Sequence, residues 1–131
     1  MALIQSFRDL DVYKLARQQA GKIFVITRSF PKEERYSLTD QIRRSSRAVN
    51  AMLAEGWGRR RYIGAFINKV DEAMNEGMET QAWLDHALDS NYIRPEQHLE
   101  LDEGWQHVGA MLNRIIERAD TFCKLPPKGN R

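Results

Sequence analysis

Seven basic residues in the middle of the chain have side chains that can bind phosphate groups. Guanidinium groups bind phosphate oxygens in a forked geometry, and several of them on one face release counterions from a nucleic acid. The rings of Tyr36, Trp57 and Tyr62 lie close to them in the sequence and can stack on unpaired bases. The pattern predicts a surface that binds nucleic acid, with structured RNA as the expected ligand. Its members are Arg43, Arg44, Arg47, Arg59, Arg60, Arg61 and Lys69.

The same arginines have a second interpretation, in which they stabilise the protein instead of binding a ligand. Arg43 and Arg47 stand one helical turn apart and can pair with glutamates of the third predicted helix, within the chain or across a subunit interface. Trp57 and Trp83 can equally belong to the core. Both interpretations stay open at the level of the sequence.

Carboxylates on the third predicted helix are the candidates for a metal site. Glu72, Glu76 and Glu79 are spaced so that they share one helix face, and helical bundles can hold two metal ions between such carboxylates. The di-iron pattern also needs a glutamate three residues before a histidine on two helices. No histidine of this chain has one, whether His86, His98 or His107. We therefore expect no metal and no cofactor.

No hydroxyl group stands in a recognisable catalytic motif. Ser45, Ser46 and Thr80 fall inside predicted helices, away from any nucleophile elbow. Residues 56–58 (GWG) lack both the spacing and the lysine of a phosphate-binding loop. We therefore expect a protein without catalytic residues and without enzymatic activity.

Length and composition favour a single domain over residues 1–131. Hydrophobic residues make up 42% of the chain and charged residues 29%, and a chain of this length buries roughly two-thirds of the surface that its unfolded state exposes. No window has the ~18 consecutive apolar residues of a membrane span, and the first residues lack a secretory signal pattern. The single cysteine, Cys123, cannot close a disulfide within the chain. We expect a cytoplasmic protein.

The two halves of the chain carry opposite net charges. Residues 1–61 have 13 Lys and Arg against 6 Asp and Glu, whereas residues 62–131 have 7 against 12. This asymmetry favours either self-association through opposite faces or a basic surface for a polyanion.

Four helices are expected to position these side chains. Apolar residues recur at three- and four-residue steps over residues 10–28, 38–57, 62–89 and 95–122. Pro31 ends the first helix, the Ser37 hydroxyl is expected to cap the second, and Pro95 stands near the start of the fourth. No stretch alternates as a half-buried strand does. The short connections predict an all-α, antiparallel up-down-up-down bundle, followed by a flexible tail over residues 124–131.

The apolar stripes of these helices are wider than one core requires. The expected buried lines include Phe24 in the first helix and Leu99 in the fourth, and Met78 lies beside the main line of the third. A second buried surface is therefore expected. A homo-oligomer is its simplest source.

Four segments of the chain resemble the motifs of a known family. They are residues 7–16 (FRDLDVYKLA), 30–45 (FPKEERYSLTDQIRRS), 54–59 (AEGWGR) and 79–85 (ETQAWLD). Together they are similar to the bacterial four-helix bundle proteins, which include the intervening-sequence proteins encoded inside large-subunit ribosomal RNA genes. The resemblance covers residues 7–122, and within it Gly56 is expected to let helices approach where a side chain would not fit.

The resemblance implies a closed ring of bundles, commonly a homopentamer, and no enzymatic activity. Distant members are accessory proteins of diversity-generating retroelements, which bind a reverse transcriptase and nucleic acid through basic surfaces. In a ring, the arginines of the second helix either meet carboxylates of the neighbour or line the central surface. We therefore expect Arg43 and Arg47 to be partly structural and Arg59, Arg60 and Arg61 to be the stronger phosphate contacts. A homo-oligomeric adaptor that binds a protein partner, such as a reverse transcriptase, is the alternative function.

Overall fold

The computed structural model describes residues 3–124 of the chain. This part contains five α-helices and two single-turn 3-10 helices. The long helices are α1 (Asp11–Thr27), α2 (Leu38–Trp57), α3 (Ile63–Asp89) and α4 (Pro95–Glu117). The short elements are η1 (Phe7–Asp9), η2 (Lys32–Glu34) and α5 (Ala119–Phe122). Residues 3–124 contain no strand, so the all-α prediction is confirmed. The tail expected over residues 124–131 lies, beyond Lys124, outside the described residues.

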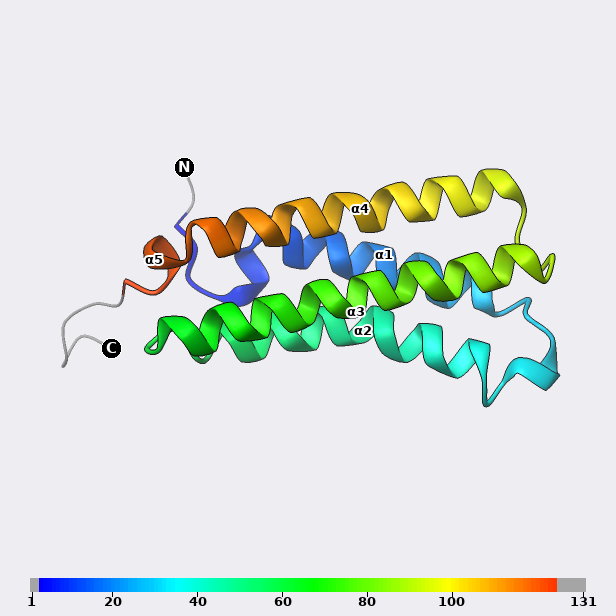
Figure 1. The fold of residues 1–131 in the computed structure, drawn as a ribbon, viewed down its shortest axis with the longest axis horizontal. Helices are drawn as coiled ribbons and strands as arrows, with labels where there is room; N and C mark the ends of the chain where they lie inside the picture. The colour runs from blue at the N-terminus through cyan, green and yellow to red at the C-terminus, as the bar shows by residue number, and fades with distance from the viewer. Residues whose placement is uncertain (1–2, 125–131) are drawn as a thin grey trace.

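The four long helices lie side by side along the long axis of the molecule (Figure 1). The α1–α2 and α3–α4 connections lie at one end, and the α2–α3 turn and α5 lie at the other. The contact between α2 and α3 is the most extensive, and that between α1 and α4 is the smallest among the long helices in contact. The helix α2 therefore contacts both α1 and α3. None of the described helices has the length and apolar character needed to cross a membrane.

An apolar core runs along the inside of the bundle, and its largest fully buried side chains are Trp105, Ile23, Ile42, Leu84 and Leu112. Two polar links cross it. The Ser45 and Thr80 hydroxyls, 2.8 Å apart, join α2 to α3. The Gln19 Nε2 atom donates to the Leu101 carbonyl at 3.2 Å and joins α1 to α4. These links supply the partners that buried polar groups require.

The start of α2 differs from the sequence expectation. Ser37 precedes the helix, but its hydroxyl donates to Glu34 Oε1 at 2.6 Å and caps no backbone amide. The carboxylate is the stronger acceptor, and the Leu38 amide also donates to this oxygen, at 3.4 Å. The Tyr92 hydroxyl, from the α3–α4 connection, donates to Glu34 Oε2 at 2.7 Å. These hydrogen bonds, above all the one from Ser37, hold the pKa of Glu34 below its ordinary value.

The fourth helix ends earlier than expected, at Glu117 instead of residue 122. The break occurs at Arg118, whose φ of −111° and ψ of 26° leave the helical region. The change of direction lets the short α5 pack on α3, where Phe122 stacks on Phe66 with ring centroids 6.3 Å apart. Burying that ring favours the break over a straight continuation of the helix.

Two residues expected in buried lines are exposed, whereas the close approach expected at Gly56 is confirmed. Phe24 is 41% exposed and Leu99 is 59% exposed, because both lie at the edge of a stripe that is wider than the contact it makes.

At Gly56, an added Cβ atom would lie 3.1 Å from the Cβ atom of Lys69. The absence of a side chain at Gly56 therefore sets the spacing of α2 and α3 at this point.

Candidate nucleic-acid interface

The seven predicted basic residues form two groups, one in the first half of α2 and one in the α2–α3 turn and the start of α3. Arg43, Arg44 and Arg47 lie in the first half of α2, near the end of the molecule that carries the α1–α2 connection (Figure 1). Residues 59–61 lie in the α2–α3 turn at the other end, and Lys69 lies in the second turn of α3. Arg47 lies ten residues, or about 15 Å, before the end of α2, so no single small ligand spans both groups.

Arg44 is the arginine that pairs with the glutamates of α3. Its Nη1 atom lies 3.1 Å from Glu76 Oε2, and its Nη2 atom contacts Glu79 Oε2. The Trp83 indole also donates to Glu79 Oε2, at 3.1 Å. Burial opposes the charge of Arg44, but the two carboxylates outweigh this effect and raise the pKa of the guanidinium. Its charge is therefore already neutralised within the chain.

The expected pairing of Arg43 and Arg47 with α3 glutamates does not occur within residues 3–124. Successive residues of a helix are rotated by about 100°, so Arg43 and Arg47 face α1 while Arg44 faces α3. The Arg43 Nε atom donates to the buried Thr27 hydroxyl at 2.8 Å. That hydroxyl lies 2.8 Å from the Ile23 carbonyl, to which it donates. Arg43 is thus anchored through one nitrogen, and its two Nη atoms have no hydrogen-bond partner among the described residues.

Three guanidinium groups converge on the partly exposed ring of Phe24. The Cζ atoms of Arg43, Arg47 and Arg28 lie 4.8, 5.7 and 5.8 Å from the ring centroid. Each position is favourable for a cation–π interaction, which is worth about 0.5–1 kcal/mol at an exposed site. Within residues 3–124 none of the three is within ion-pair distance of a carboxylate. No ion pair among the described residues therefore offsets their mutual repulsion.

A surface hollow of about 500 Å³, called the α2 hollow below, is lined by Arg43 and Arg47 but not by Arg28. Tyr36 lies on its edge with 84% of its surface exposed, and the Arg35 guanidinium lies 5.6 Å from the centroid of that ring. Asp40 is the single carboxylate among the residues that line it. The full lining is Arg35, Tyr36, Thr39, Asp40, Arg43, Arg44 and Arg47.

The arginines of the α2–α3 turn are not equivalent. Arg60 folds back on Trp57, with its Cζ atom 3.7 Å from the ring centroid and its Nε atom donating to the Trp57 carbonyl at 2.8 Å. Burial lowers the pKa of Arg60. Arg59 and Arg61 are exposed, and the neighbouring Tyr62 is 66% exposed. Only Arg59 and Arg61 of this run therefore present their guanidinium groups to solvent.

Lys69 is held by carboxylates on both sides. Its Nζ atom lies 3.1 Å from Glu72 Oε2 on α3 and 3.7 Å from Glu55 Oε1 on α2. Its side chain is 19% exposed. Lys69 therefore contributes to the α2–α3 contact and adds little to the positive surface.

Sequence reasoning missed Arg28, Arg35 and the surface position of Phe24. Phe24 belongs to an apolar stripe, which predicts burial, and only the packing of α1 reveals that its ring is at the surface. One signal for this part of the site was present, because Phe24 and Arg28 stand four residues apart on one helix face. Arg35 lies in the connection between helices, and no helical period relates it to the arginines of α2.

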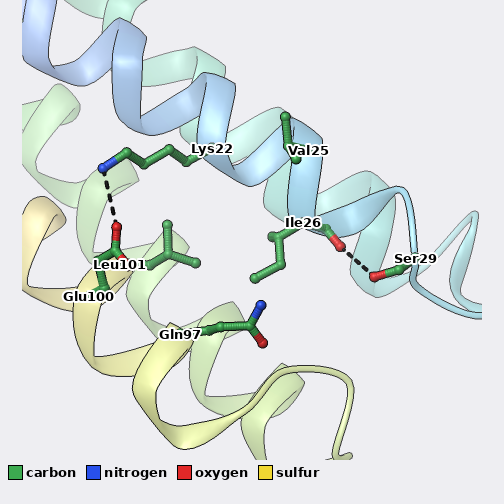
Figure 2. Close-up of a pocket in the computed structure, with 7 residues that line it drawn as sticks. All are labelled: Lys22, Val25, Ile26, Ser29, Gln97, Glu100 and Leu101. Carbon is green, nitrogen blue, oxygen red and sulfur yellow. Dashed lines mark hydrogen bonds and ion pairs between the residues drawn. The ribbon is translucent and has the colours of Figure 1, made fainter.

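A separate apolar groove lies between α1 and α4, with a volume of about 470 Å³. Figure 2 shows the Lys22 side chain of α1 reaching across to Glu100 of α4, where Nζ and Oε1 are 3.6 Å apart. Ile26 and Leu101 line the groove, and Val25 beside them is 63% exposed. This groove lies where the contact between the long helices is smallest, so part of each apolar stripe stays uncovered.

Residues 3–124 contain no group of three or more His, Cys, Asp and Glu side chains arranged to hold a metal ion. The carboxylates of Glu76 and Glu79 are engaged by Arg44, and that of Glu72 by Lys69. Their shared helix face is thus used by ion pairs, of which those of Glu76 and Glu79 join α2 to α3 and that of Glu72 lies within α3.

Comparison with known proteins places the chain by family and by fold. The family model described as "23S rRNA-intervening sequence protein" matches residues 8–114. No curated protein matches the chain. A solved structure from Bacteroides thetaiotaomicron, a protein of unknown function from the S23 ribosomal protein family, is similar in fold with a TM-score of 0.72 at 24% identity; the match covers 81% of this chain and 95% of that one. The matched span is most of the chain, and the chain therefore belongs to the 23S rRNA-intervening sequence protein family.

Proposed function

We propose that this chain is a non-enzymatic, cytoplasmic four-helix bundle protein that binds structured RNA through guanidinium groups in the first half of α2 and in the α2–α3 turn. The observation that carries the proposal is that Arg47, Arg59 and Arg61 are exposed and have no carboxylate partner within residues 3–124. Exposed tyrosines, Tyr36 and Tyr62, accompany the two groups. Unpaired guanidinium groups beside exposed aromatic rings are the features by which proteins bind RNA backbones and unstacked bases.

The proposal assigns unequal roles to the seven predicted residues. Arg47, Arg59 and Arg61 contact phosphate, and Arg43 contributes through its free Nη atoms. The other three stabilise the fold instead. Arg44 pairs with Glu76 and Glu79, Arg60 contacts Trp57, and Lys69 pairs with Glu72.

The proposal includes an up-down-up-down, antiparallel bundle that assembles into a ring, a homopentamer. The short connections between successive helices support the first part. Exposed apolar side chains on three helices, Val25, Met78 and Leu99, support the second, because they need a partner surface. The positive half of the chain and the negative half can then meet between neighbours through a heterologous interface. Light scattering coupled to size-exclusion chromatography tests this assembly, and a monomeric mass would contradict it.

The RNA proposal is tested by measuring affinity for a structured ribosomal RNA fragment over a salt series. The variants are Arg47→Glu and the double reversal Arg59→Glu with Arg61→Glu, each with Arg60 left intact so that the Trp57 contact is preserved. Arg114→Glu is the matched control, because Arg114 is exposed on α4 and belongs to neither group. We expect affinity to fall steeply with salt and each test variant to bind at least about tenfold more weakly.

The control should retain most of the affinity of the wild-type protein. Binding that does not depend on salt, or test variants that assemble and bind as tightly as the control, would contradict the proposal.

The second candidate function is a homo-oligomeric adaptor for a protein partner such as a reverse transcriptase, with the arginines serving assembly. The groove between α1 and α4 favours it, because Val25, Ile26 and Leu101 offer an apolar surface flanked by the Lys22–Glu100 pair. Titration with a purified reverse transcriptase, comparing the wild-type protein with Val25→Lys, tests this candidate. Tight binding that Val25→Lys abolishes without dissociating the oligomer supports an adaptor, and absence of binding rules out this partner class.

A further inference from the structure

We propose that the α2 hollow is a site for an unpaired nucleotide, whose phosphate binds Arg43 and Arg47 and whose base stacks on Tyr36. The proposal rests on the RNA-binding function proposed above and names the part of the RNA that this end of α2 takes. It concerns one end of the molecule, and it is independent of any role of Arg59 and Arg61 at the other.

The charges around the hollow call for an anion. Arg35, Arg43 and Arg47 line the hollow, and none of them is ion-paired with a carboxylate within residues 3–124. Arg28 does not line the hollow, but it lies beside Arg43 and Arg47 at the Phe24 ring. Arg44, which also lines the hollow, shows the contrast, because Glu76 and Glu79 neutralise it. Arg44, which faces α3, is thus ion-paired within the chain, whereas Arg35, Arg43 and Arg47 outnumber Asp40, the single carboxylate that lines the hollow. A bound phosphate supplies the missing negative charge.

The position of Arg43 is set before any ligand binds. Its Nε atom donates to Thr27 Oγ1 at 2.8 Å, and Thr27 is 2% exposed and bonded in turn to the Ile23 carbonyl. Its guanidinium also lies over the Phe24 ring at 4.8 Å. These contacts hold the guanidinium plane while leaving both Nη atoms for a ligand. A fork held in this way loses less side-chain entropy on binding a phosphate than a free arginine does.

The aromatic ring at the edge of the hollow selects an unpaired nucleotide over a duplex. Tyr36 lines the hollow with 84% of its surface exposed, and Arg35 lies 5.6 Å from the ring centroid. An exposed ring can stack on a base only if that base has left its own stack, as in loops and single strands. The hollow of about 500 Å³ beside it is large enough for a phosphate and sugar between the ring and the arginines.

The carboxylate of Asp40 makes this site different from a surface that binds any polyanion. It lines the same hollow as Arg43 and Arg47, and it is the single acidic group there. A second phosphate placed next to it would be repelled, so the hollow takes one phosphate and not a continuous run of them. This favours a single extruded nucleotide over the regular backbone of a helix.

The test compares the binding of a short single-stranded RNA with that of the duplex it forms with its complement, by fluorescence anisotropy at fixed salt. The full-length protein is used as wild type and as Tyr36→Ala, Tyr36→Phe, Arg47→Gln and the control Arg114→Gln. We expect the wild-type protein to bind the single strand several-fold more tightly than the duplex. Tyr36→Ala should weaken single-strand binding about tenfold and remove that preference, since stacking on one aromatic ring is lost.

Tyr36→Phe should retain the preference because it keeps the ring, and Arg47→Gln should weaken binding of both RNAs more than Arg114→Gln does. Equal affinity of the wild-type protein for the two RNAs, or an unchanged preference in Tyr36→Ala, would overturn the assignment of the hollow. If salt-dependent RNA binding persists in that case, the proposed function stands without this site. If the wild-type protein binds neither RNA, the assignment of the hollow is wrong, and the affinity for the structured ribosomal RNA fragment decides the proposed function separately.

Discussion

The Arg43 Nε atom donates a hydrogen bond to the Thr27 hydroxyl over 2.8 Å, and this contact joins the exposed side of α2 to the buried side of α1. Thr27 supplies the acceptor because its own proton goes to the Ile23 carbonyl, one turn earlier in the helix. A buried hydroxyl of α1 therefore sets the direction of a guanidinium group of α2. The proposed phosphate site therefore depends on a residue that is only 2% exposed.

Replacing Thr27 tests this dependence. Thr27→Val keeps the shape of the side chain but removes the acceptor, so the Arg43 guanidinium loses its anchor. We expect RNA affinity to fall about fivefold, which corresponds to the roughly 1 kcal/mol of one hydrogen bond. Thr27→Ser retains the hydroxyl and should bind within a factor of about two of the wild-type protein. Equal losses in the two variants, measured by anisotropy on folded protein, would show that the hydroxyl is not what matters.

Arg60 and Arg61 provide a pair of adjacent residues with opposite expectations. Arg60→Gln removes the contact with the Trp57 ring at 3.7 Å and the hydrogen bond to the Trp57 carbonyl. We expect the free energy of unfolding to fall by about 1–2 kcal/mol. Arg61→Gln should change it by less than about 0.5 kcal/mol, because that side chain is exposed. Urea unfolding followed by circular dichroism measures both, and a larger loss in Arg61→Gln would contradict this assignment.

Gly56 and Gly21 are both helical glycines, and they should respond to alanine in opposite directions. A Cβ atom at Gly56 would meet Lys69 Cβ at 3.1 Å, and this atom belongs to the α3 framework and cannot move alone. We expect Gly56→Ala to destabilise the fold by about 1–2 kcal/mol through overpacking. Nothing lies within 4 Å of a Cβ at Gly21, so Gly21→Ala should stabilise by about 0.5–1 kcal/mol. Thermal unfolding in which the two variants shift alike would count against this account of the α2–α3 contact.

Glu34 makes part of the stability depend on pH. Hydrogen bonds from Ser37 and Tyr92 hold the pKa of Glu34 below its ordinary value near 4.5. The ionised carboxylate thus favours the folded state at pH values above the ordinary pKa, and this contribution is lost as the pH falls through the lower folded value. Glu34→Gln should lower the unfolding midpoint at pH 7. The difference in midpoint between this variant and the wild-type protein should be smaller at about pH 3.5.

Glu33→Gln is the matched control for this measurement, since Glu33 is an exposed neighbour without a hydrogen bond among the described residues. It should shift the midpoint little at either pH. If Glu34→Gln lowers the unfolding midpoint by the same amount at pH 7 and at pH 3.5, the titration of Glu34 is not the cause.

The positions of the helices were predictable because their determinants are local. The three- and four-residue spacing of apolar side chains, together with Pro31, Trp57-Gly58 and Pro95, is enough to place four helical segments. The break at Arg118 was not predictable in this way. It depends on Phe122 reaching Phe66 of α3, and this contact joins residues that are far apart in the sequence.

The amino-acid sequence by itself determined that the chain is helical and that its arginines gather on the second helix and in the turn that follows it, and the family resemblance implied a close approach at Gly56. Only the tertiary structure decided which arginine is free. Arg43, Arg44 and Arg47 are alike in type and close in sequence, yet one is anchored on Thr27, one is neutralised by Glu76 and Glu79, and one is left exposed. The periodicity of a helix sets the direction of each side chain relative to the others, whereas the charge it meets depends on which helix packs on that side.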